Sequence, residues 1–157
     1  MTDQQQIPQT STKIDQKVAV IIDTNAIIKQ LNLRLVINPS IQTDEEFAEK
    51  YELYTLKEVI GEVRDERARQ FLANLPYEVQ IEDSSFIDDA DRITVENFAK
   101  DTGDFKTLSY VDILVIAFGL TLAREKGEIQ HVLQEPKPLE EFRPKSFKEF
   151  YDAGFEV

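Results

Sequence analysis

The sequence predicts an α/β domain with a central, mostly parallel sheet, and three observations lead to this fold class. With 157 residues, of which 41% are hydrophobic, the chain is long enough for one buried core. The run VAVII at residues 18–22 is continuously aliphatic, as in a strand buried on both faces. Predicted strands then alternate along the chain with predicted helices, a pattern typical of parallel sheets covered by helices.

The first part of the chain is predicted to hold that strand, with a helix starting directly after it at residues 24–31, TNAIIKQL. Before the strand, residues 1–16 are polar and have no apolar stretch, which indicates a disordered tail rather than a signal peptide. Residues 32–50 look like a long connection interrupted at Pro39, with a short helix from Thr43.

A long helix is predicted over residues 55–76, because its apolar residues recur at helical spacing and Pro76 ends it. Residues 77–83, YEVQIED, alternate as in a short strand. The remaining predicted elements are a helix from about 86 to 100, a break at 101–109, a very apolar helix at 110–123 and a strand at 128–134.

Composition limits the classes of function. The net charge is −12, with 30 acidic and 18 basic residues, which argues against a simple electrostatic grip on nucleic acid. The chain has no cysteine, so disulfides and thiolate metal sites are excluded within this sequence. No apolar run approaches the length of a membrane span, and no membrane partner is expected.

Acidic residues at the ends of predicted elements indicate a metal site. Asp23 ends the first strand, and sites in parallel α/β folds form at the carboxyl ends of strands. Glu62 borders an apolar helix stripe, Asp112 opens the apolar helix, and Asp104 precedes it in TGDF. Carboxylates gathered at one edge repel one another unless a divalent cation joins them, and oxygen ligands favour Mg²⁺ or Mn²⁺. Such a cluster suits hydrolysis of a phosphodiester.

Each of these acids also has a structural interpretation. Asp23 is a good helix N-cap, and Ser109 with Asp112 has the spacing of a capping box. Glu62 on its own is typical of a solvated helix face, and Asp104 of a turn. The single histidine, His131, lies between apolar neighbours in a predicted strand and has no evident catalytic partner. Spacing alone leaves both interpretations open.

Three segments of the chain read VIIDTNAII, YTLKEVIGEVRDERARQFLANLPYEV and FAKDTGDFKTLSYVDILVIAFGLTLA. Together they resemble a PIN domain, and more narrowly the PIN-domain endonuclease of the Nin-one-binding (NOB) protein family, which matures the 3′ end of small-subunit ribosomal RNA. The resemblance implies a three-layer α/β/α domain over residues 17–136, with a loop insertion at 33–50. Residues 137–157 would then be an extension leading to a zinc ribbon and basic segments beyond this sequence.

The same resemblance implies the site and its chemistry. Asp23, Glu62 and Asp112 fall on the acids that bind the catalytic metal, with Asp104 and Glu128 in supporting roles. The implied activity is a hydrolytic endoribonuclease that uses Mg²⁺ or Mn²⁺ and leaves a 5′ phosphate and a 3′ hydroxyl.

The implied partners are precursor small-subunit rRNA and pre-40S assembly factors that include a KH-domain protein. The implied location is the nucleus and the cytoplasm, with cleavage in the cytoplasm. Two basic clusters are candidate RNA contacts, one formed by Arg64, Arg67 and Arg69 and the other by Arg143, Lys145 and Lys148. Basic segments outside this sequence would answer the objection raised by its acidic charge.

Two other functions compete with the nuclease. The first is a catalytically silent PIN-fold module that docks on pre-40S particles through its acidic surface. The second is a phosphatase with Asp23 as a covalent nucleophile. The phosphatase is disfavoured because haloacid dehalogenase-like enzymes usually have a second aspartate two residues later, where this chain has Asn25.

Overall fold

The computed structural model describes residues 16–132, which form two compact units that divide between Phe86 and Ile87. Unit 1 holds the described residues up to Phe86, and unit 2 holds those from Ile87 onward. Most of the predicted polar tail, the 137–157 extension and the second basic cluster lie outside the described residues. Within the described part, no helix has the length and apolar character needed to cross a membrane.

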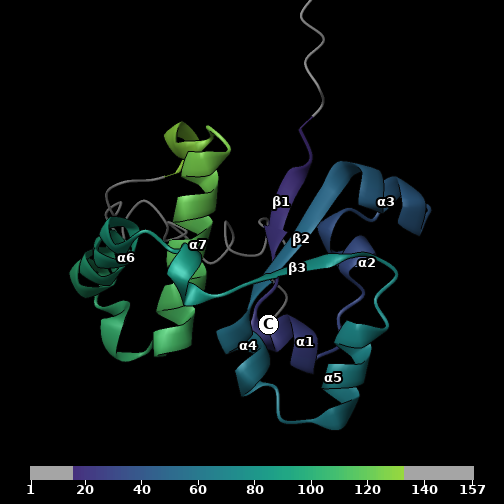
Figure 1. Cartoon of the computed structure of the whole chain (residues 1–157), viewed down its shortest axis with the longest axis horizontal. Helices are drawn as coiled ribbons and strands as arrows, with labels where there is room; N and C mark the ends of the chain where they lie inside the picture. The colour runs from purple at the N-terminus through teal and green to yellow at the C-terminus, as the bar shows by residue number, and fades with distance from the viewer. Residues whose placement is uncertain (1–15, 133–157) are drawn as a thin grey trace, which may run out of the picture. The chain divides into compact units, whose positions relative to one another are not determined.

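Unit 1 is built on a parallel sheet of three strands in the order β1-β2-β3 (Figure 1). The strands are β1 (Val18–Ile21), β2 (Tyr51–Leu56) and β3 (Val79–Glu82). The predicted parallel α/β class is therefore confirmed. Because all three strands run the same way, their carboxyl ends lie at one edge of the sheet.

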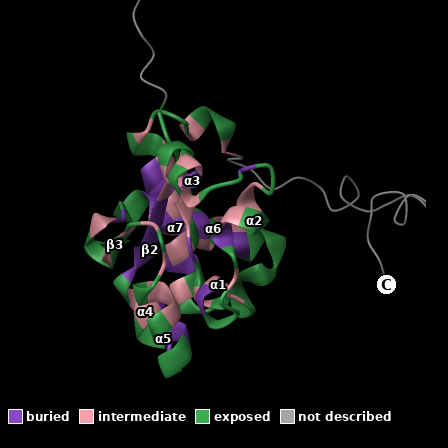
Figure 2. Ribbon diagram, turned by 90° about the vertical axis from the view of Figure 1, so that its right-hand side faces the viewer, coloured by how far each residue is buried: buried purple, intermediate pink, exposed green. Residues whose placement is uncertain are grey.

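The central strand β2 is an element that the sequence analysis missed. Its last four residues, Leu53 to Leu56, are buried, and Figure 2 shows the strand largely in the buried colour. The strand mixes Glu52 and Thr55 among its apolar residues, so it reads neither as alternating nor as an aliphatic run. Thr55 is tolerated in the core because its hydroxyl donates to the Ile22 carbonyl oxygen at 2.8 Å.

The single helix predicted over 55–76 is wrong, because the chain forms two helices after β2. They are α4 (Lys57–Glu62) and α5 (Glu66–Ala73). Val63 leaves the helical conformation, and Asp65 starts α5 as its N-cap by accepting the Arg67 N–H at 3.3 Å. A capping aspartate inside the apolar pattern ended one helix and began the next.

The stretch between β1 and β2 is largely helical. The helix α1 (Thr24–Ile28) begins where predicted and ends earlier, before Gln30 with its positive φ of 50°. The short helix expected from Thr43 is confirmed as α3 (Asp44–Lys50). A further helix, α2 (Leu33–Ile37), occupies residues that were expected to form a loop. Buried Leu33, Ile41 and Phe47 anchor this stretch.

Unit 2 is a pair of helices, α6 (Asp89–Thr102) and α7 (Tyr110–Glu125), and both were predicted. Gly103, with φ of 84°, ends α6 in the left-handed conformation that glycine favours. A short 3₁₀ turn, η2 (Asp104–Lys106), follows it. Buried Asp91 of α6 pairs with Arg124 of α7 and accepts the Thr121 hydroxyl at 2.9 Å, so the two helices share a polar contact as well as an apolar one.

The strand predicted at 128–134 is wrong for its described part. Residues Ile129–His131 form a 3₁₀ turn, η3, and His131 is exposed in it. Gly127, with φ of 73°, turns the chain directly after α7, which leaves no room for an extended run there.

Candidate active site

Asp23 follows the end of β1 and caps α1. Its Oδ1 accepts the Ala26 N–H at 2.9 Å, and its side chain is exposed at the carboxyl edge of the sheet. The capping interpretation is therefore correct, but it uses only one of the two carboxylate oxygens. Within the described chain no hydrogen bond reaches Oδ2, which remains able to bind a ligand.

Glu62 ends α4 and lies beside the start of α1. Its Oε2 accepts the Thr24 hydroxyl at 2.6 Å, across 38 positions of sequence. The contact follows from the parallel pairing of β1 with β2, because α1 and α4 leave neighbouring strands at the same edge (Figure 1). The structure thus brings the second predicted acid into hydrogen-bond contact with Thr24, the residue that directly follows the first predicted acid. Glu62 is exposed, but it is not simply a solvated helix-face charge.

Thr24 is the residue that the sequence analysis did not identify. It follows Asp23 directly and donates to Glu62, so it ties the chain that carries the first acid to the second acid. Its position next to Asp23 was a weak signal, because a threonine at the first residue of a helix is common. The contact depends on which strands are neighbours in the sheet, and the strand order is known only from the three-dimensional structure.

The other side of the same edge is held by charged contacts between α4 and the turn after β3. Lys57 pairs with Asp83 at 3.1 Å. The hydrogen bond from the Ser85 hydroxyl is the larger cause, and the contact with Lys57 the smaller one, that together lower the pKa of Asp83 to about 2. Asp83 is therefore a carboxylate over the whole neutral range, and it is committed to these partners rather than to a metal.

Glu58 is the second acid on α4 and faces the same turn. Its Oε1 accepts the Ser84 N–H at 3.1 Å, while its Oε2 is buried and has no hydrogen-bond partner within residues 16–132. Burial acts to raise the pKa of Glu58, but hydrogen bonds from Ser84 and from its own N–H outweigh it and leave the pKa below the usual value. Glu58 therefore stays ionised, and its hydrogen bond from Ser84 holds the turn that follows β3 against α4.

The third predicted ligand, Asp112, lies in unit 2 at the start of α7. Its Oδ2 accepts the Ser109 N–H at 2.7 Å, and the Ser109 hydroxyl accepts the Asp112 N–H at 3.1 Å. The predicted capping box is therefore confirmed. The box leaves Oδ1 of the exposed Asp112 side chain without a hydrogen bond inside the described chain.

The two supporting candidates are also in unit 2. Asp104 begins η2, and its carbonyl oxygen accepts from Thr107 and Leu108, while its exposed carboxylate takes no part. Glu128 precedes η3 and is exposed, with its backbone N–H donating to the Ala123 carbonyl oxygen at 2.8 Å.

Asp23 and Glu62 are the two predicted ligands that lie in one unit, unit 1, and the Glu62 carboxylate is hydrogen-bonded to the residue that follows Asp23. Taken one unit at a time, the described residues contain no group of three or more acidic or histidine side chains that could hold a metal ion. Two carboxylates with uncommitted oxygens nevertheless fit a hard cation, because Mg²⁺ keeps several waters and is usually held by one or two protein carboxylates. The donors in unit 1 are thus suitable for Mg²⁺ or Mn²⁺.

The predicted RNA-contact arginines lie directly after Glu62. Arg64 is in the break between α4 and α5, and Arg67 is in the first turn of α5; both are exposed and form no ion pair within the described chain. Arg69 is also exposed, but its Nε donates to the Val63 carbonyl oxygen at 2.8 Å and so supports the break. Arg64 and Arg67 are the better candidates for a phosphate contact.

Comparison with known proteins places this arrangement in a family. The family described as the PIN domain of ribonuclease matches residues 20–122, which is well over half of the chain. The chain therefore belongs to the PIN-domain ribonuclease family.

Among individual proteins, the chain is similar to RNA-binding protein NOB1 of Rattus norvegicus, with 38% identity over 85 residues, and of Mus musculus, with 36% over 85 residues. It is also 30% identical over 129 residues to the RNA-binding NOB1-like protein of Arabidopsis thaliana. These alignments cover 54%, 54% and 82% of this chain but only 20%, 20% and 19% of the relatives. The resemblance to NOB proteins is confirmed, and the chain spans about one fifth of the length of these curated relatives.

Proposed function

We propose that this chain is the nuclease domain of a metal-dependent endoribonuclease. The observation that carries the proposal is the hydrogen bond from Thr24 to Glu62, which joins the end of α4 to the residue after Asp23 at the carboxyl edge of a parallel sheet. Membership of the PIN-domain ribonuclease family supports RNA as the substrate. Asp112 enters the proposal through the sequence resemblance and not through the placement of the two units.

The residues of the chain would divide the work as follows. Asp23 and Glu62 would bind the cation. The hydrogen bond from the Ala26 N–H to Oδ1 of Asp23 restrains this carboxylate and leaves Oδ2 available to the cation. Thr24 holds the Glu62 carboxylate in one orientation. A bound Mg²⁺ or Mn²⁺ supplies an activated water and neutralises charge that develops on the phosphate. Arg64 and Arg67, which are exposed shortly after Glu62 in the chain, would contact phosphates of the RNA.

The substrate we propose is precursor small-subunit rRNA at its 3′ end, with products that carry a 5′ phosphate and a 3′ hydroxyl. The similarity to proteins named RNA-binding protein NOB1 supports RNA binding. Pre-40S assembly factors, among them a KH-domain protein, would supply positioning that this acidic chain lacks. We place the protein in the nucleus and the cytoplasm, with cleavage in the cytoplasm.

The test uses variants that keep the local hydrogen bonds and remove one charge. Asp23→Asn retains an N-cap, Glu62→Gln retains an acceptor for Thr24, and Asp112→Asn retains an acceptor for Ser109. We expect each to weaken Mn²⁺ binding measured by calorimetry, and to lower cleavage of a precursor RNA by at least about 100-fold. Glu49→Gln, an exposed acid of α3, is the matched control and should change neither.

The alternative is the silent interaction module. It predicts that all four variants bind Mn²⁺ equally and that partner binding ignores the metal. Equal calorimetric curves for Asp23→Asn and the control would remove the nuclease proposal and favour the module. A third outcome is that the three site variants lose Mn²⁺ binding while neither they nor the natural chain cleaves RNA. In that case the metal site is present, and the absence of cleavage is explained by weak RNA binding of this chain.

A further inference from the structure

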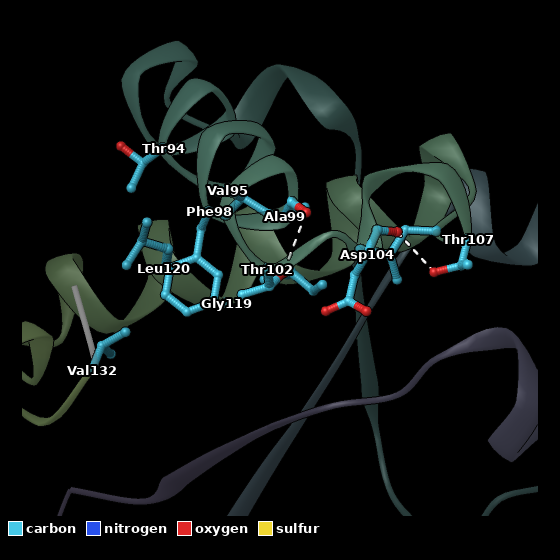
Figure 3. A pocket seen from close by; sticks show the side chains of 12 residues that line it. Thr94, Val95, Phe98, Ala99, Thr102, Asp104, Thr107, Gly119, Leu120 and Val132 are labelled. Carbon is cyan, nitrogen blue, oxygen red and sulfur yellow. Dashed lines mark hydrogen bonds between the residues drawn. The ribbon is translucent and has the colours of Figure 1, made fainter. Parts of the chain in front are cut away.

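Unit 2 contains an apolar cavity of about 480 Å³ between α6 and α7. Figure 3 shows Phe98 and Leu120 at one end of it, and Asp104 and Thr107 at the other. A cavity of this size is in the range of ligand pockets. Threonines and one acid supply the polar groups of its lining: Thr94, Thr102, Thr107 and Asp104.

Two features of the lining restrict what can occupy the cavity. Asp104 is the single charged residue of the lining, and its carboxylate forms no ion pair with any residue between 16 and 132. An occupant that carries a positive charge beside apolar side chains would therefore suit this rim. Val132, the last described residue, is also part of the lining, so the chain passes the cavity just before residues 133–157.

We infer that the chain's own segment RPKSFKEFY, residues 143–151, docks in this cavity. Phe147, Phe150 and Tyr151 are spaced three and four positions apart, and residues at these spacings share one side of a helical turn. The segment carries three basic residues, Arg143, Lys145 and Lys148, against one acid, Glu149. In this proposal the aromatic residues of the segment supply the apolar surface that the cavity can accept, and its basic residues supply the charge opposite to that of Asp104.

The neighbouring apolar stretch fits less well. Leu139 and Phe142 flank Glu140 and Glu141, and two acids next to Asp104 would repel it. Reach does not limit either stretch, because Phe147 is about fifteen residues beyond Val132 and an extended chain of that length spans roughly 50 Å. A short tether also raises the local concentration of the segment at the cavity to the order of millimolar.

The experiment uses the full chain with one spin label. The natural sequence has no cysteine, so Ser146→Cys gives a single site for a nitroxide. We expect methyl NMR signals of Val95, Leu108 and Leu120 to lose most of their intensity when the label is paramagnetic and to recover it when the label is reduced. Phe147→Ser combined with Phe150→Ser should restore at least half of that intensity, because the segment then stays in solvent.

Controls make each outcome decisive. Phe142→Ser, with the same label, should leave the broadening unchanged. Asp104→Asn should reduce the broadening, which tests the charge contact without altering the apolar residues. Equal broadening with and without the two phenylalanines would overturn the inference. Broadening that persists when spin-labelled chains are mixed with separate isotope-labelled chains would also overturn it, since a second copy would then be the occupant.

Discussion

At the scale of single residues, the Thr24 hydroxyl is the group that holds the Glu62 carboxylate beside the start of α1. A hydrogen bond to a carboxylate does more than satisfy a donor, because it removes rotational freedom from a side chain that must present its other oxygen to a ligand. Glu62 is exposed, so burial does not hold its carboxylate in place. The Thr24 contact at 2.6 Å is what orients it.

Replacing Thr24 by valine tests this role. Valine keeps the branched shape and removes the donor, so Glu62 loses its orientation while the fold stays intact. Partners of this kind typically change metal affinity by about 10- to 100-fold, and we expect a loss of about 10-fold in Mn²⁺ affinity by calorimetry. Thr24→Ser keeps the hydroxyl and should bind as the natural chain does. A valine variant with natural affinity would show that Thr24 orients nothing.

Asp83 gives a prediction about acid stability. Its folded pKa of about 2 lies below the ordinary aspartate value of 3.8, because the Ser85 hydroxyl and Lys57 favour the carboxylate. Its contribution to stability is therefore complete above about pH 4 and is lost as the pH falls through about 2. Urea unfolding between pH 5 and pH 2 should show a smaller loss of stability for Asp83→Asn than for the natural chain.

The cause of that pKa shift can be separated by two further variants. Ser85→Ala should raise the Asp83 pKa toward 3.8, and by more than Lys57→Met does, because the serine contact is the larger cause. Carboxyl NMR titration measures both values. A lysine variant with the larger effect would mean that the ion pair, and not the serine, holds the carboxylate ionised.

At the scale of elements, the sequence predicted those whose pattern is local. The aliphatic run of β1 and the Ser109–Asp112 box at the start of α7 were both identified correctly. The central strand β2 was missed, since the hydroxyl of its buried Thr55 is satisfied by the Ile22 carbonyl oxygen, 33 positions earlier in the chain. Likewise, the position of Asp23 in the sequence was enough to predict that it follows the first strand and caps the next helix. The contact of Glu62 with Thr24 could not be predicted in this way, because it depends on the order of the strands in the sheet. What the sequence could not supply were pairings between distant segments.

The α6–α7 pair contains one buried charge whose contribution to stability can be tested. Asp91 is 1% exposed and is held by Thr121 and Arg124. Asp91→Asn keeps an acceptor for Thr121 but loses the charge, and Arg124 can turn to water because its side chain is 54% exposed. We expect urea unfolding to show a loss of about 1–3 kcal/mol. Asp89→Asn, two residues away and 88% exposed, should cost less than about 0.5 kcal/mol.

At the scale of the whole molecule, the net charge limits how the proposed RNA substrate could be bound. A net charge of −12 repels a phosphate backbone, so any grip on RNA must come from local groups. Arg64 and Arg67 are exposed next to Glu62. Such a grip would be weak and would depend strongly on ionic strength, because each phosphate contact releases bound counterions.

That dependence gives the last prediction. For single-stranded RNA, the logarithm of the binding constant falls with the logarithm of salt by about 0.7 per phosphate contact. Arg64→Gln with Arg67→Gln should therefore reduce the slope by about 1.4, measured by fluorescence anisotropy between 50 and 200 mM salt. Lys17→Gln with Lys50→Gln removes the same charge elsewhere in unit 1 and should lower affinity without changing the slope comparably. Equal slopes for the two double variants would mean that net charge, and not a phosphate contact beside Glu62, governs the encounter.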